Sequence, residues 1–238
     1  FAPKHKGGEN LRAQLRTRLK KLKEKLSKTK KSKKSSKQGI KKEDMQAVLV
    51  GFTNSGKSSL IDALTNVKPE INDVKFTTKN PLIGMMNHAG TQIQLIENPP
   101  IDSEFYDRGL TNTADTILII VDKLGEIEEI EKRLSMTNGK RIIIFNKTDL
   151  LSGNEIRKIS ATLQSKKYNF VLISALWAGG RGNLAGQSVV SLDELKEKIF
   201  KSFDKIRVYT KEPGKEKSGK PIIMNPCSAV RDIAEKIL

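Results

Sequence analysis

The stretch that most constrains this fold is Gly51-Phe52-Thr53-Asn54-Ser55-Gly56-Lys57-Ser58. It follows the apolar run 47–50 and leads into residues 59–64, which have the pattern of an amphipathic helix. A strand, a glycine-rich turn, a lysine, a hydroxyl and a helix, in this order, are typical of a phosphate-binding loop. The glycines let several backbone N–H groups converge on one anion, and the helix N-terminus adds its positive end. The sequence therefore predicts a loop that binds phosphate groups.

Two side chains at the end of this loop indicate a nucleotide. Lys57 is expected to reach the β- and γ-phosphates, and the Ser58 hydroxyl to bind Mg²⁺. Glycine-rich turns before helices also occur in proteins that bind no nucleotide, but the preceding strand and the Gly-Lys-Ser ending favour the phosphate-binding interpretation. The residues predicted to contact the phosphates are Gly51, Phe52, Thr53, Asn54, Ser55, Gly56, Lys57, Ser58 and Ser59.

A second motif, Asn146-Lys147-Thr148-Asp149, follows the β-branched run 141–145. Ligands of open parallel sheets bind just beyond the carboxyl ends of the strands, so this motif has the right place for a base-binding loop. The Asp149 carboxylate can accept hydrogen bonds from N1–H and the 2-amino group of guanine, two donors that adenine does not offer. Asn146 suits the O6/N7 side of the base and a link to the phosphate loop. The aliphatic stem of Lys147 can lie along the purine ring.

A third apolar run, residues 168–173, ends in Ser174-Ala175-Leu176, whose backbone N–H groups can meet O6 of guanine. Taken alone, Asn-Lys-Thr-Asp is also a plausible exposed turn, and Ser-Ala-Leu carries almost no information. Each motif, however, closes a predicted strand, and the motifs occur in the order that a guanine site requires. Together they predict specificity for guanine.

With these motifs the chain resembles the Obg-like GTPases, nearest to their developmentally regulated GTP-binding protein branch. The resemblance extends to Phe76-Thr77-Thr78, which is similar to the first switch of that family. It also includes residues 4–9 and the leucine-striped basic segment after them. Residues 206–211, 217–221 and 228–234 are similar to the opening of a TGS domain, a small ubiquitin-like β-grasp module.

The resemblance implies an α/β fold: a P-loop NTPase GTPase domain with a mostly parallel, doubly wound sheet. It implies that GTP and GDP are the ligands, that Mg²⁺ is the cofactor and that Thr78 supplies a second hydroxyl to this ion. It also implies a protein partner for the TGS-like region. The named branch carries an inserted subdomain, and residues 102–140 leave no room for it. The resemblance to Obg-like GTPases in general is therefore stronger than the resemblance to that branch.

One motif departs from that family, which has Asp-x-Pro-Gly where this chain has Glu97-Asn98-Pro99-Pro100. Glu97 keeps a carboxylate that can orient a Mg²⁺-bound water. Pro100 has no N–H group and cannot make the usual donation to the γ-phosphate. We therefore expect slow hydrolysis and weakened sensing of the γ-phosphate, with guanine-nucleotide binding retained.

Asn54 has two interpretations. In one, it helps to hold a monovalent cation, K⁺, beside the phosphates, where the cation stabilises transition-state charge. In the other, asparagine simply tolerates a tight loop conformation. The candidate catalytic residues are Lys57, Thr78 and Asn54, and the candidate Mg²⁺ ligands are Ser58, Thr78 and Glu97.

The N-terminal arm, residues 1–42, carries a net charge of +15 out of the formal +17 of the chain. Leucines recur in it at helical spacing, followed by the Lys/Ser-rich, low-complexity linker 27–42. Such a segment suits an RNA phosphate backbone, and the resemblance adds that Obg-like proteins associate with ribosomes. The alternatives are a solvated tail whose leucines dock on the domain, and a helix on an anionic membrane. The leucines are Leu11, Leu15, Leu19, Leu22 and Leu26.

We expect three parts: the basic helical arm and disordered linker 1–42, a GTPase domain 43–204 and a partial TGS-like domain 205–238. No apolar run approaches the roughly 20 residues of a membrane span, and a secretory signal core is missing. With one cysteine, no internal disulfide forms, and a cytoplasmic location is expected. The start at Phe1 and the short TGS-like tail suggest a fragment.

The predicted function is a guanine-nucleotide-dependent molecular switch that binds and slowly hydrolyses GTP in ribosome- or RNA-associated translation or ribosome assembly. Two alternatives stay open. One is a hydrolysis-deficient, GTP-binding RNA adaptor, which Pro100 motivates. The other is a membrane-surface or protein scaffold led by the basic helix.

Overall fold

A computed structural model describes residues 13–23, 40–65, 80–174, 190–211, 213–214 and 216–237. The chain divides into two compact units, residues 1–41 and 42–238. In the first unit, residues 13–23 are helical, and Leu15, Leu19 and Leu22 are each more than half exposed. The predicted leucine stripe continues at Leu11 and Leu26, which lie outside the described residues. No helix in the described part has the length and apolar character that crossing a membrane requires.

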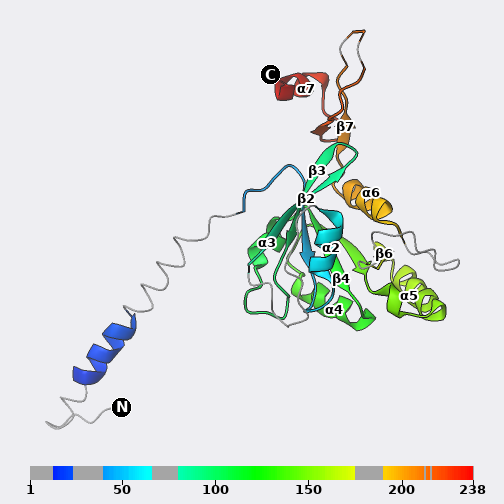
Figure 1. Cartoon of the computed structure of the whole chain (residues 1–238). Helices are drawn as coiled ribbons and strands as arrows, with labels where there is room; N and C mark the ends of the chain where they lie inside the picture. The colour runs from blue at the N-terminus through cyan, green and yellow to red at the C-terminus, as the bar shows by residue number, and fades with distance from the viewer. Residues whose placement is uncertain are drawn as a thin grey trace. The chain divides into compact units, whose positions relative to one another are not determined.

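The second unit is built on a sheet with the strand order β2-β3-β1-β4-β5-β6 (Figure 1). All neighbouring strands run parallel except β2 and β3, which form an antiparallel hairpin at one edge. The predicted mostly parallel sheet is therefore confirmed. The strands are β1 Gln46–Val50, β2 Leu82–His88, β3 Thr91–Glu97, β4 Thr116–Val121, β5 Lys140–Phe145 and β6 Phe170–Leu172.

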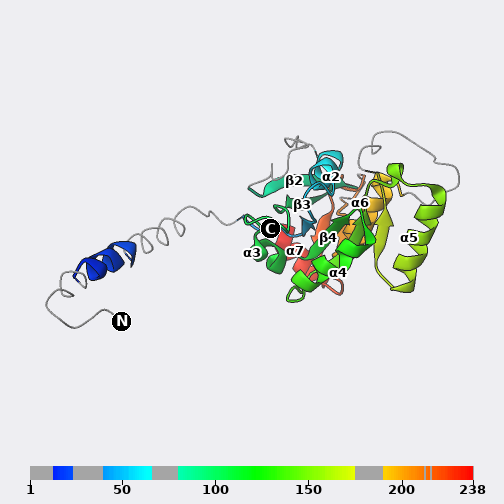
Figure 2. The same ribbon diagram turned by 90° about the horizontal axis from the view of Figure 1, so that it is seen from below.

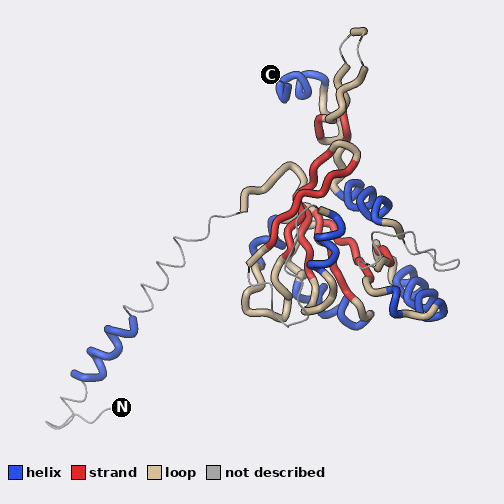
Figure 3. Tube along the Cα trace, in the orientation of Figure 1, coloured by secondary structure: helices blue, strands red, loops and turns tan. Residues whose placement is uncertain are grey.

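Helices alternate with the parallel strands along the chain (Figure 3). Every residue of β1 and β4 is buried, as is typical of parallel strands covered on both faces. Figure 2 shows α2 and α6 on one side of the sheet and α3 and α4 on the other. This is the doubly wound α/β arrangement. The helices are α2 Lys57–Leu64, α3 Arg108–Thr113, α4 Leu124–Arg133, α5 Gly153–Ser165 and α6 Leu192–Ser202.

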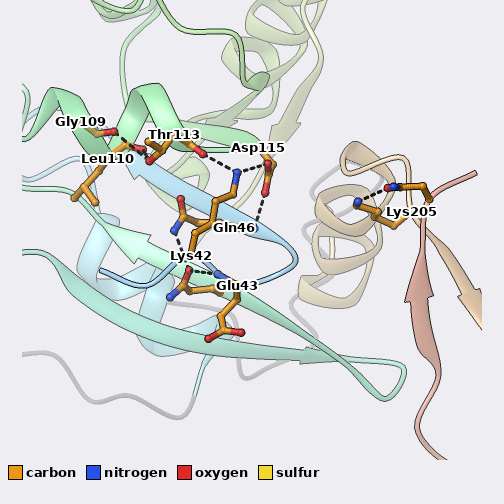
Figure 4. Close-up of polar contacts among 10 residues, drawn as sticks. Lys42, Glu43, Gln46, Gly109, Leu110, Thr113, Asp115 and Lys205 are labelled. Carbon is orange, nitrogen blue, oxygen red and sulfur yellow. Dashed lines mark hydrogen bonds and ion pairs between the residues drawn. The ribbon is translucent and has the colours of Figure 1, made fainter. Parts of the chain in front are cut away.

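Polar contacts fix the start of β1 (Figure 4). The Lys42 ammonium donates to the carbonyl of Thr113 at 2.9 Å and pairs with Asp115 Oδ1 at 2.6 Å. The other carboxylate oxygen of Asp115 accepts from the Gln46 N–H at 3.1 Å, and Gln46 Nε2 donates to Gln94 Oε1 at 2.9 Å. The second unit thus begins at the amino end of its parallel strands, opposite the loop that follows β1.

The C-terminal part consists of the antiparallel pair β7 Ile206–Val208 and β8 Ile222–Met224, followed by α7 Val230–Ile237. The Arg207 guanidinium lies 3.7 Å from the centroid of the Phe200 ring in α6. The assignment of these elements to a TGS domain remains a prediction.

Helix α6 contacts both this C-terminal part and the β2–β3 hairpin. Glu197 Oε2 lies 2.7 Å from His88 Nε2 and 3.8 Å from Arg207 Nη2. At the hairpin turn, Gly90 has φ +75°, and a Cβ added there would lie 2.8 Å from the carbonyl oxygen of Gly219. The hairpin, α6 and the segment before β8 are therefore packed together.

Candidate nucleotide-binding site

The predicted phosphate loop lies between the carboxyl end of β1 and the start of α2 (Figure 1). Gly56 precedes the helix with φ +92°, a conformation that glycine adopts at little cost. A Cβ added at Gly56 would lie 2.1 Å from Asn146 Nδ2, and one added at Gly51 would lie 2.4 Å from the carbonyl oxygen of Ile120. Both glycines are needed because the loop packs directly against the ends of neighbouring strands.

Lys57 is buried, with 4% of its surface exposed. Its ammonium donates to the carbonyls of Gly51 at 3.2 Å and Phe52 at 2.8 Å. Burial lowers the pKa of Lys57 to about 8, and the nearby carboxylates Glu97, Asp102 and Glu126 oppose this shift. None of the ion pairs among the described residues includes Lys57. A buried cation in a glycine-containing loop at a helix N-terminus suits a polyphosphate.

Two of the predicted Mg²⁺ ligands lie side by side. The Ser58 hydroxyl donates to Glu97 Oε1 at 2.6 Å, and Glu97 is 1% exposed. A hydroxyl and a carboxylate are oxygen ligands of the kind that Mg²⁺ binds while keeping several waters. The third predicted ligand, Thr78, lies outside the described residues. Within the described part, no group of three or more His, Cys, Asp or Glu side chains could hold a metal ion.

The predicted base loop contacts the phosphate loop directly. Asn146, buried at the end of β5, donates from Nδ2 to the carbonyl oxygen of Ser55 at 3.0 Å. This is the link between the two loops that the sequence led us to expect. The same amide group occupies the space that Gly56 leaves by having no side chain.

The other two base-loop residues are held by side chains from neighbouring strand ends. Lys147 has φ +58°, and its ammonium pairs with Asp122 Oδ2 at 2.7 Å. Asp149 Oδ1 accepts a hydrogen bond of 2.5 Å from the Ser174 hydroxyl. Ala175 and Leu176, which were predicted to face the base, lie outside the described residues. The structure therefore brings Asn146, Lys147 and Asp149 to the carboxyl edge of the sheet, next to the phosphate loop.

The segment after β3 is attached to the phosphate loop. The N–H of Ile101 donates to the carbonyl of Gly51 at 3.1 Å, and the N–H of Ser103 donates to the carbonyl of Pro100 at 2.9 Å. From α4, Arg133 Nη1 donates to the carbonyl of Ile101 at 2.7 Å. Pro100 has no N–H group, and the N–H of the next residue, Ile101, already donates to the Gly51 carbonyl.

Four charged residues around the loops were not among the predicted site residues. Asp102 accepts a hydrogen bond from Thr53, and Glu126 has a pKa raised mainly by burial and also by nearby Asp122. The position of Asp122 directly after the apolar run 116–121 was a usable signal, because site residues gather at strand ends. The four residues are Asp102, Asp122, Glu126 and Arg133.

Comparison with known proteins agrees with this geometry. Residues 46–147 match the sequence model of the 50S ribosome-binding GTPase family. An uncharacterised GTP-binding protein of Methanocaldococcus jannaschii is 26% identical over 99% of this chain and 78% of its own length. GTPase Obg of Aquifex aeolicus is 29% identical over 67% of this chain and 50% of its own length, and that of Lachnoclostridium phytofermentans is 32% identical over 66% and 41%. The chain spans half or less of these Obg relatives.

Solved structures show the same fold. Era from Aquifex aeolicus bound to GDP and AlF4⁻ superposes with a TM-score of 0.52 at 23% identity, over 66% of this chain and 56% of that one. Era in complex with MgGDPNP and a fragment of 16S ribosomal RNA gives a TM-score of 0.53 at 24% identity, with the same coverage. The chain therefore has the α/β fold of a P-loop GTPase domain, and its sequence is similar to Obg GTPases.

The contact at Gly56 leads to a first prediction. Gly56→Ala should lower the free energy of unfolding by about 1–3 kcal/mol, because the new Cβ meets the Asn146 amide and the backbone keeps a positive φ. Gly125→Ala is the matched control, since a Cβ there meets nothing within 4 Å. Urea unfolding of both variants checks this. Equal stability of the two variants would show that the loops are not in contact.

Burial of Lys57 predicts a pH dependence. Its pKa falls from 10.5 to about 8 on folding, so the unfolded chain binds the proton more tightly. Burial of the charged Lys57 therefore lowers the free energy of unfolding below about pH 8. This destabilisation decreases as the pH rises towards 10.5. For the nucleotide-free protein, Lys57→Met should flatten the rise in unfolding free energy between pH 8 and 10, by up to about 3 kcal/mol.

The substitution leaves both carbonyl partners of Lys57 with a donor, because Gly51 still accepts from the Ile101 N–H and Phe52 from the Ser55 N–H. Lys57→Met should therefore be at least as stable as the unmodified chain at pH 7. Denaturant unfolding at several pH values tests this, with Lys132→Met on the surface of α4 as the control. The interpretation fails if the pH slopes of the protein and of Lys57→Met are identical.

Proposed function

We propose that this chain is a guanine-nucleotide-binding switch protein that binds GTP and GDP and hydrolyses GTP slowly. The observation that carries the proposal is the hydrogen bond from Asn146 to the Ser55 carbonyl, which places the base loop against the phosphate loop. The similarity to Obg GTPases and to an archaeal GTP-binding protein supports it. The nearest branch we propose is that of the developmentally regulated GTP-binding proteins, with residues 205–238 as a partial TGS domain.

In this proposal the backbone N–H groups of residues 51–59 bind the phosphates and Lys57 neutralises part of their charge. The Asp149 carboxylate accepts from N1–H and the 2-amino group of guanine. The Ser174 hydroxyl already donates to Oδ1 of that carboxylate, so it orients the group that reads the base. The N–H groups of Ala175 and Leu176 would meet O6.

Ser58, Glu97 and Thr78 would hold Mg²⁺, which when bound neutralises phosphate charge. Lys57, Thr78 and Asn54 would act in hydrolysis. Asn54 is exposed with φ +62°, a left-handed conformation that asparagine tolerates, and this supports its interpretation as a residue of a tight loop. A K⁺ ion beside it remains the second proposal, and comparing hydrolysis rates in K⁺ and Na⁺ separates the two.

Slow turnover is proposed from the segment after β3. Pro100 cannot donate to a γ-phosphate, and the Ile101 N–H is bonded to Gly51. The same observation favours the second candidate, a GTP-binding RNA adaptor that scarcely hydrolyses GTP. Single-turnover hydrolysis with Mg²⁺ distinguishes these two functions.

An RNA or ribosomal partner in the cytoplasm is proposed from the basic arm. The arm carries +15, and the described helix 13–23 is exposed along its length. The matched family is described as ribosome-binding, and one Era structure contains 16S ribosomal RNA. The third candidate, a membrane-surface or scaffold protein, would use the same helix. The TGS-like region is proposed to bind a protein partner.

Asp149→Asn tests the guanine assignment. The amide offers one acceptor where the carboxylate offers two, so the Kd for GDP should rise roughly 30-fold, about 2 kcal/mol. The weak affinity for ATP should not change. Asp193→Asn, a carboxylate with 90% of its side chain exposed, is the matched control. Titration calorimetry with GDP, GTP and ATP gives all three values. Unchanged GDP affinity in Asp149→Asn would remove this residue from the site.

Replacing Lys20, Lys21 and Lys23 by Gln tests the arm. If these exposed residues neutralise RNA phosphates, the slope of log K against log salt should shrink by about 2–3, because each neutralised phosphate adds about 0.7–0.9 to the slope. Lys→Arg at the same positions keeps the charge and should keep the slope. Ribosome co-sedimentation and vesicle binding are compared across a salt series. Binding to anionic vesicles but not to ribosomes would favour the membrane-surface alternative.

A further inference from the structure

The Asp102 carboxylate is hydrogen-bonded to the phosphate loop. Both oxygens of Asp102 lie 3.2 Å from Thr53 Oγ1, in the third residue of the loop, and the hydroxyl donates to them. Asp102 is itself exposed, so its charge lies at the surface beside the loop and not in the core. The residue before it, Ile101, is bonded through its N–H to Gly51 at 3.1 Å.

A second set of contacts keeps this carboxylate in place. Arg133 of α4 donates to the Ile101 carbonyl at 2.7 Å, and its other terminal nitrogen bonds Glu129 at 2.8 Å. The Arg133 guanidinium also lies 5.9 Å from the ring centroid of Phe52, the second loop residue. Asp102 cannot move away from Thr53 by a swing of its segment unless these bonds break.

The contacts also indicate which end of the polyphosphate Asp102 faces. The base loop meets the phosphate loop at Ser55, through Asn146. The segment with Asp102 meets it at Gly51 and Thr53, the end of the loop where the Lys57 ammonium donates to the carbonyls of Gly51 and Phe52. A nucleotide whose base lies at Asp149 therefore directs its terminal phosphate towards Asp102. The lysine of such loops reaches the last phosphates. Here the Asp102 charge raises the pKa of Lys57, against the larger effect of burial.

We propose that Asp102 determines nucleotide specificity: its carboxylate, hydrogen-bonded to Thr53, disfavours binding of a third phosphate. This inference rests on the proposed guanine-nucleotide site. The site then holds GDP more tightly than GTP. The physical reason is repulsion between two anions, since GTP carries more negative charge than GDP at the end that Asp102 occupies. Pro100 adds to the effect because the N–H that would compensate is missing. Binding of GTP requires the bond between Thr53 and Asp102 to open.

The test measures affinities for GDP and for guanylyl imidodiphosphate, a triphosphate that is not hydrolysed, with Mg²⁺ and the full chain. Asp102→Asn removes the charge but keeps a hydrogen-bond acceptor for Thr53. It should tighten binding of the triphosphate about ten-fold and change GDP affinity less than two-fold, as expected for loss of one charge repulsion. Glu104→Gln, an exposed carboxylate in the same segment, is the matched control and should change neither value.

Three results would overturn the proposal. Equal changes for GDP and the triphosphate would show that Asp102 does not sense the third phosphate. Weaker triphosphate binding by Asp102→Asn would show that the carboxylate helps to hold Mg²⁺ or the triphosphate itself. If the folded protein, checked by its thermal unfolding curve, binds neither guanine nucleotide, then the proposed function fails together with this inference. If the protein binds guanine nucleotides but Asp102→Asn leaves the ratio of the GDP and triphosphate affinities unchanged, only the proposed role of Asp102 is rejected.

Discussion

The hydrogen bond between Asn146 and the Ser55 carbonyl is the contact on which the geometry of this site depends. It joins a loop that follows β1 to a loop that follows β5, with β4 between them in the sheet. The approach is close enough that a side chain at Gly56 would displace the Asn146 amide. Once the loops are fixed to each other, Lys57 at the start of α2 and Asp149 after β5 lie at the same edge of the sheet. This contact supports the proposal that phosphate and base bind in one site.

The fold could be read from the sequence because its signals are local. The runs 47–50, 141–145 and 168–173 predicted strands of a mostly parallel sheet, and the structure has β1, β5 and β6 there. The motifs that close two of them lie at the predicted edge, and the expected link from Asn146 is present. Roles assigned to Thr78, Ala175 and Leu176 remain predictions, since these residues are outside the described part of the chain.

The contacts that the sequence did not predict join residues far apart in the chain. Nothing in the local pattern around Arg133 indicates that it donates to Ile101, because the distance between them depends on how α4 packs. The bond between Thr53 and Asp102 likewise exists only because the segment after β3 lies against the phosphate loop. The burial that lowers the pKa of Lys57 also depends on the assembled loops. The sequence therefore predicted which side chains lie in the candidate site, but not their long-range partners, their burial or the resulting pKa shift.

In the proposed function, one site binds a polyphosphate through main-chain amides and a guanine ring through the loop that carries Asp149. Hydrogen–deuterium exchange of the full chain, with GDP or ADP at equal concentration, tests it most directly. GDP should slow amide exchange in residues 51–59 and 146–149 together, because both loops would contact one ligand, while ADP should protect neither. Equal protection by ADP and GDP, or none by GDP, would show that the two loops do not form a guanine-nucleotide site.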